Sequence, residues 1–94
     1  MLIPSQVKIG GITYKVEVAN TWPERDGVGP EADHGYCSNE RDTLYIGSNL
    51  SPKAKEITLI HEALHAMNTT IDHEFLDSLA EQLYQFLSDN DMLK

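Results

Sequence analysis

This chain of 94 residues has little cysteine, few basic side chains and no long apolar run. Its one cysteine, Cys37, excludes an internal disulfide and a cysteine-based zinc finger, and is typical of a reducing, intracellular compartment. Seven basic side chains against 15 acidic ones give a formal net charge of −8. Binding to nucleic acid or to anionic membrane needs a positive surface, so we expect neither as a partner.

No apolar run approaches the roughly 18–20 residues of a membrane span. Residues 1–5 lack the basic and apolar regions of a signal peptide, so we expect a cytoplasmic protein. The length predicts a single domain over residues 1–94. Its core should be small, because a chain of this size buries only about 60–65% of its unfolded surface.

The sequence changes character near position 50, and we expect sheet and loops over 1–50 and two helices over 51–94. In the first half, β-branched and aromatic residues alternate with polar ones. Gly10-Gly11 separates two of these runs, as a two-residue hairpin turn would. We expect a small antiparallel sheet of three to four strands. The predicted strands cover residues 7–9, 12–18, 35–38 and 43–47.

After Pro52 the chain has no glycine and no proline, and apolar residues recur at helical spacing. Ser51-Pro52 is a typical helix start, because serine caps the first turn and proline suits the first helical position. This helix should run to about Asn68, and a second should begin near Asp72. Since the break between them is short, we expect two antiparallel helices packed on the sheet, in an α+β fold.

The strongest signal is His61-Glu62-Ala63-Leu64-His65, an H-E-x-x-H motif within the first predicted helix. Residues four apart share one helix face, so both imidazoles can reach one metal ion at about 2.0–2.1 Å, the usual Zn–N distance. Glu62 is rotated by about 100°, and so lies beside the ion, where it can accept a proton from water. The motif predicts zinc on His61 and His65, with Glu62 as the catalytic base.

A catalytic zinc site usually has three protein ligands and one open position, and we expect the third ligand from the second helix. On a helical wheel His73 and Asp77 border the apolar stripe, so local geometry favours them. Glu74 lies further round, but its side chain is long. Asp72 and Glu81 are further candidates. Acidic residues in a first helical turn also stabilise the helix dipole without any metal.

Weaker candidates lie elsewhere. His34 and Tyr36 flank the strand expected nearest the site and could donate a hydrogen bond to an oxyanion, although surface or core roles are commoner. Cys37 is more often a small buried hydrophobe than a ligand. Tyr84 is expected in the core, and Trp22 either plugs the sheet or lies at a binding surface.

From position 35 to 90 the sequence resembles the short phage and prophage zincin-like metallopeptidases, which are similar to the ImmA/IrrE-type peptidases. The H-E-x-x-H motif points to zincins in general, and the ending Leu-Tyr-Gln-Phe-Leu-Ser-Asp-Asn at 83–90 points to the phage group. The resemblance implies that the two motif histidines bind zinc and that the motif glutamate is the base. It also implies Glu74 as the third ligand, with His73 and Asp77 as alternates.

The sequence thus predicts a zinc-dependent metallopeptidase that hydrolyses a peptide bond in a protein or peptide substrate. The substrate could lie extended along the sheet edge and add a strand to it. The alternative is a non-catalytic binding protein, in which zinc is a structural staple and the acidic surface captures a host protein. Four protein ligands would favour this alternative, and an open position would favour the peptidase. The sequence predicts neither the substrate nor the oligomeric state.

Overall fold

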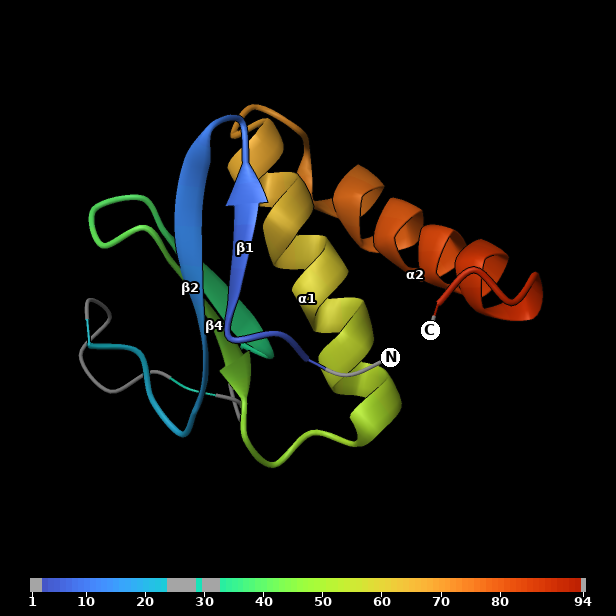
Figure 1. Ribbon diagram of the computed structural model, residues 1–94, viewed down its shortest axis with the longest axis horizontal. Coiled ribbons are helices and arrows are strands. Elements are labelled where there is room, and N and C mark those ends of the chain that lie inside the picture. Colours follow the sequence, from blue (N-terminus) through green and yellow to red (C-terminus); the bar gives the residue numbers. More distant parts are fainter. Residues whose placement is uncertain (1–2, 24–28, 30–32, 94) are drawn as a thin grey trace.

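The structure, a computed structural model, describes residues 3–23, 29 and 33–93. It consists of a sheet, a helix packed against the sheet, and a second helix on the far side of the first (Figure 1). The predicted α+β class is confirmed, but α1 packs on the sheet and α2 packs on α1, whereas the sequence predicts that both helices pack on the sheet. The elements in chain order are β1 (Gln6–Ile9), β2 (Ile12–Ala19), β3 (Gly35–Ser38), β4 (Thr43–Gly47), α1 (Pro52–Met67) and α2 (His73–Asp89).

The four-stranded sheet is mixed, which corrects the antiparallel sheet expected from the sequence. Its strand order is β1-β2-β4-β3, and the pairs β1–β2 and β3–β4 are antiparallel. The central strands β2 and β4 are parallel, with Val16 opposite Leu44. A parallel pair needs a crossover connection, which here consists of the segment after β2 together with β3. Alternation along a strand shows which side chains share a face, but it does not encode the direction of the neighbouring strand.

The predicted β1–β2 hairpin is present. Gly10 and Gly11 connect the two strands with φ angles of 57° and 85°, values that non-glycine residues rarely adopt. The turn places Ile9 opposite Ile12. The hairpin contributes Ile9 and Tyr14 to the buried cluster between sheet and helix. The other members of that cluster are Leu44, Ile46 and Leu59.

Both helices begin where the sequence predicts. Ser51 caps α1, and its Oγ accepts a hydrogen bond from the backbone N–H of Ala54 at 3.1 Å. Asp72 is the N-cap residue of α2, which turns back beside α1 and diverges from it toward the C-terminal end (Figure 1). Tyr84 is buried, as expected, and its hydroxyl donates to Oε1 of Glu56 at 3.3 Å. Among the described residues, no helix has both the length and the apolar character needed to cross a membrane.

The edge strand β3 approaches α1 so closely that position 35 has no room for a side chain. A Cβ atom on Gly35 would lie 2.6 Å from Cγ2 of Thr58, 2.7 Å from the backbone oxygen of Tyr45 and 3.1 Å from Oε2 of Glu62. Thr58 and Glu62 are one helical turn apart on α1, and both are buried. Glycine therefore lets β3 rest directly on the turn of α1 that carries Glu62.

We expect Gly35→Ala to destabilise the protein by about 1–3 kcal/mol, because the added methyl group must displace either buried side chains or the strand itself. Urea denaturation of the variant and the wild type measures this difference. Thr13→Ala, on an exposed position of β2, is the control and should change stability by less than about 0.5 kcal/mol. Equal urea midpoints for Gly35→Ala and the wild type would show that β3 is not tightly packed on α1.

Candidate metal centre

Three imidazoles from two helices lie together. His61 and His65 are one turn apart on α1, and His73 is the first residue of α2. The distances between ring centroids are 5.0 Å for His61–His65, 5.3 Å for His61–His73 and 4.7 Å for His65–His73. One nitrogen atom from each ring lies within 4.8 Å of the other two, so the three residues are close enough to hold one metal ion.

The structure brings His73, and not Glu74, to the histidine pair. Glu74, the third ligand that the resemblance implies, is exposed and does not belong to the group of candidate ligands. Positions 73 and 77 are four residues apart and share the face of α2 that meets α1, whereas position 74 is rotated by about 100°. The structure thus places beside the histidine pair one of the two residues that the helical wheel favours.

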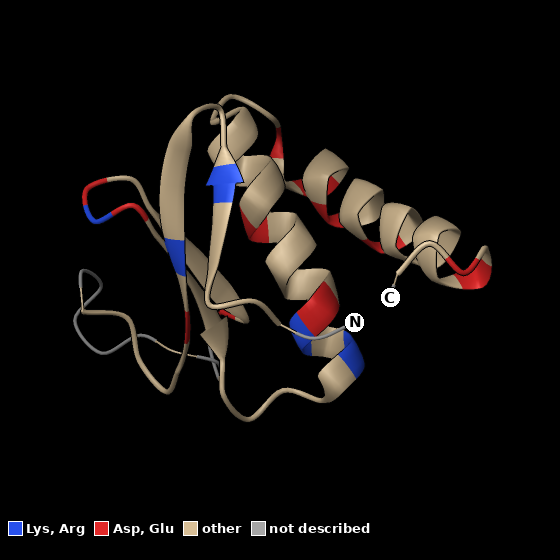
Figure 2. Cartoon of the chain, viewed as in Figure 1, with Lys and Arg blue, Asp and Glu red and all other residues tan. Residues whose placement is uncertain are grey.

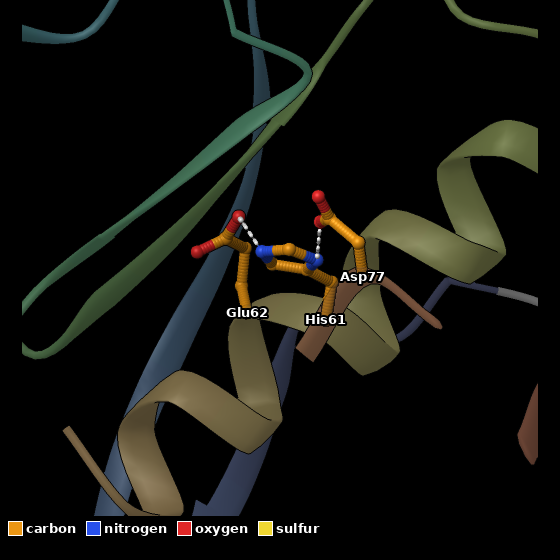
Figure 3. Close-up of polar contacts among 3 residues, drawn as sticks. All are labelled: His61, Glu62 and Asp77. Carbon is orange, nitrogen blue, oxygen red and sulfur yellow. Dashed lines mark ion pairs between the residues drawn. The ribbon is translucent and has the colours of Figure 1, made fainter. Parts of the chain in front are cut away.

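Asp77 lies behind His61 and orients it. Nδ1 of His61 is 3.0 Å from Oδ1 of Asp77 in an ion-pair contact, close enough for the ring N–H to donate to the carboxylate (Figure 3). Such a bond fixes the tautomer of the imidazole and leaves the lone pair on Nε2, the nitrogen that can then bind a metal. Asp77, an alternate for the third ligand, therefore contacts a candidate ligand, His61, and does not itself belong to the group of candidate ligands.

Glu62 faces the other nitrogen of the same ring. Its Oε2 is 3.9 Å from Nε2 of His61 (Figure 3), and its side chain is only 7% exposed. Burial and, to a smaller extent, the negative charges of Asp33 and Asp77 raise the pKa of Glu62 to about 8. A carboxylate whose pKa lies near neutrality can both accept and release a proton at physiological pH.

The two histidines on α1 are held in the form that binds metals. Burial is the main cause that lowers the pKa of His61 and of His65, so both rings are neutral at pH 7. Neutral imidazole is the metal-binding form, and nitrogen is a preferred donor for zinc. The donor set therefore fits a zinc ion.

Two cavities flank the histidine group. The larger, of about 480 Å³, lies on the side of His61, and the smaller, of about 180 Å³, lies on the side of His65. Gly35, Glu62 and His73 line both of them. The start of β3 therefore forms a wall common to the two cavities, with the candidate metal centre between them.

The weaker candidates divide between these cavities and the core. His34 lines the larger cavity, whereas Tyr36 and Cys37 line the smaller one. Burial raises the pKa of Cys37 to about 11, so its thiol stays protonated at neutral pH and is a poor ligand. Trp22 is fully buried, with its ring centroid 5.7 Å from that of Tyr45, so it plugs the sheet.

Comparison of the chain with protein-family models, with curated proteins and with solved structures finds no match.

The burial of Glu62 should lower the stability of the metal-free protein at neutral pH. Its pKa is about 8 in the folded state and about 4.5 when unperturbed, so the folded state binds more protons between these values, and stability falls as the pH rises through this window. Glu62→Gln removes this loss. We expect the metal-free variant to be more stable than the metal-free wild type by about 1–3 kcal/mol at pH 7.

Urea denaturation in the presence of a chelator measures this difference, which should shrink as the pH is lowered toward 4.5. Glu74→Gln alters an exposed carboxylate at the start of α2 and is the matched control, with no comparable gain. If Glu62→Gln and the wild type have the same stability at pH 7, the carboxylate of Glu62 is not held in a strained, buried state.

Proposed function

We propose that the protein is a zinc-dependent metallopeptidase of the zincin class. The observation that supports this most directly is the buried carboxylate of Glu62, which faces Nε2 of His61 at the edge of a three-histidine group. Zincins combine such a pair of helical histidines with a glutamate that acts as general base. The cavities on both sides of the group provide space for a substrate on either side of the centre.

The proposed zinc ligands are His61, His65 and His73. This set has a histidine where the family resemblance implies Glu74, and three-histidine sites are an established form of catalytic zinc. Asp77 would keep His61 in the metal-binding tautomer by accepting the hydrogen bond from its Nδ1.

The proposed reaction is hydrolysis of a peptide bond. Zinc, when bound, supplies a Lewis acid that polarises water and the scissile carbonyl group. Glu62 would accept the proton of the attacking water on its carboxylate and then deliver it to the leaving amine. Its raised pKa suits both transfers, since the acid and the carboxylate forms are both populated at pH 7.

The strand β3 offers a place for the substrate backbone. It is an edge strand of the sheet, paired with β4 on one side, and its first residue, Gly35, lines both cavities. An extended peptide can add a strand to the edge of a sheet through backbone hydrogen bonds. Its alternate side chains could then enter the cavities on either side of the centre.

The alternative, a non-catalytic zinc-stabilised binding protein, has less support. A structural zinc site is closed by four protein ligands. Within the described part of the chain, the candidate group has three members, and Cys37, which lines the neighbouring cavity, does not belong to it. A buried glutamate beside the histidines would also have no purpose in a structural site.

Metal binding distinguishes the two assignments of the third ligand. We expect His73→Ala to weaken zinc affinity by more than about 100-fold, and Asp77→Asn by about 10–100-fold, because loss of an outer carboxylate costs less than loss of a ligand. Glu74→Ala is the matched control and should change the affinity by less than about twofold, since its side chain does not reach the histidines. Competitive chelator titrations at one pH give these affinities.

A larger loss of zinc affinity in Glu74→Ala than in His73→Ala would show that Glu74, and not His73, is the third ligand. Equal affinity in all variants would exclude the second helix from the metal site.

Hydrolysis tests the function itself. We expect the zinc-loaded wild type to cleave members of a mixed peptide library, with products identified by mass spectrometry. Glu62→Gln should bind zinc equally but cleave about 10²–10⁴-fold more slowly, because glutamine cannot accept the proton. Cleavage that survives in Glu62→Gln would remove this residue from the mechanism, and a zinc-loaded wild type without any cleavage would favour the binding protein.

A further inference from the structure

Among the described residues that line the larger cavity beside the histidine group, the charged side chains other than histidine are all acidic. Its described lining residues include no lysine and no arginine, although histidines of the candidate centre contribute to it. A cleft lined by one sign of charge, with low-dielectric walls, concentrates the electric field and attracts ligands of the opposite sign. Its acidic lining residues are Asp33, Glu62, Asp77 and Glu81.

These carboxylates come from three separate elements. Asp33 precedes β3, Glu62 lies on α1, and Asp77 and Glu81 are on successive turns of α2. Figure 2 shows acidic positions along α2 and no basic ones. Acidic side chains therefore border the cavity from several sides.

The carboxylate of Glu62 provides independent evidence that the cavity is built to receive a ligand. The side chain is only 7% exposed, and its Oε2 lies 3.9 Å from Nε2 of His61, beyond hydrogen-bonding distance. No described residue donates a hydrogen bond to it, and it lines the cavity. Such a group can accept a hydrogen bond from a donor that enters the cavity, and in its ionised form it would pair with a cation.

The cavity extends well beyond the histidine group. Glu81 is eight residues after His73 on α2, which corresponds to about 12 Å along the helix. Ile57 and Thr58, one turn before His61 and Glu62 on α1, line the same cavity and add apolar surface. Its walls therefore combine an apolar surface with carboxylates that continue away from the metal ligands, which suits a long aliphatic side chain with a positive end.

The smaller cavity differs in character. It shares Asp33 and Glu62 with the larger one, but its other described lining includes Tyr36 and Cys37 and none of the carboxylates of α2. The two sides of the candidate centre are therefore chemically different. A peptide that spans them would meet different side chains on each side.

We propose that the larger cavity is a specificity subsite for a lysine or arginine side chain adjacent to the scissile bond. This inference rests on the proposed peptidase function, which it deepens by naming the substrate class. Glu81 is the residue that sets the preference, because it lines the cavity and does not belong to the group of candidate metal ligands.

The first experiment measures binding, so that it does not depend on turnover. Zinc-loaded Glu62→Gln protein is titrated at low salt with fluorescent octapeptides that are identical except for one central residue, which is arginine, leucine or glutamate. We expect the arginine peptide to bind at least about tenfold more tightly than the leucine peptide, and the advantage to shrink as salt screens the charges.

Two charge reversals on the same helix map the preference. Glu81→Lys, added to this protein, should abolish the preference for arginine. Glu74→Lys changes the net charge equally, but Glu74 does not line the cavity, so the preference should remain. Equal binding of the arginine and leucine peptides, or the same loss in Glu74→Lys as in Glu81→Lys, would overturn the proposal.

Cleavage of a peptide library by the zinc-loaded wild type separates this proposal from the function on which it rests. Cleavage sites enriched about tenfold in lysine or arginine on one side of the bond, with the enrichment lost in Glu81→Lys, would support both. Cleavage without such enrichment would overturn the subsite and leave the peptidase standing. Binding of the arginine peptide that depends on Glu81, with no cleavage, would support the subsite and contradict the peptidase.

Discussion

The three-histidine group depends on the tight turn between α1 and α2. Oδ1 of Asn68, the residue after α1, accepts hydrogen bonds from the backbone N–H and the hydroxyl of Thr70, at 3.0 Å and 2.6 Å. An asparagine that bonds to the backbone two residues later reverses the chain efficiently. Because α2 packs on α1, this turn sets the position of His73 relative to His65. A longer connection would allow α2 to shift along α1, and the imidazole of His73 would then no longer lie beside those of His61 and His65.

A second constraint, the close contact between β3 and α1, accounts for the state of Glu62. Gly35 allows the edge strand to cover the helix turn that carries this carboxylate, and the burial that results raises its pKa to about 8. The fold thus keeps a charged group where its ionised form is disfavoured. Such local cost is typical of functional sites, where a chemically useful state is retained at the expense of stability. It is harder to explain in a domain that serves only as a scaffold.

Local sequence patterns predict those features of the structure that depend on a single helix, strand or turn. They identify the Gly10-Gly11 hairpin, the helix start at Ser51, and the pair His61 and His65 on one face. They cannot predict that β2 and β4 run parallel, because strand alternation carries no information about the neighbour. The contact between Asp77 and His61 is likewise set by how two helices cross, and the acidic cavity is created by elements that are distant in the chain. The third ligand lies between these cases, since the helical wheel indicates a face but not a residue.

Several of the acidic side chains of the chain lie together at one place in the folded protein. Part of the net charge of −8 is concentrated in the cavity beside the histidines, where Asp77 and Glu81 lie on the side of α2 that faces α1. The mutual repulsion of these groups opposes folding when no cation is present. A metal ion bound to the histidines would relieve it, and binding would therefore stabilise the fold as well as prepare the site. The same field that attracts the metal would then favour positively charged side chains in a substrate, so metal affinity, stability and specificity would share one electrostatic origin.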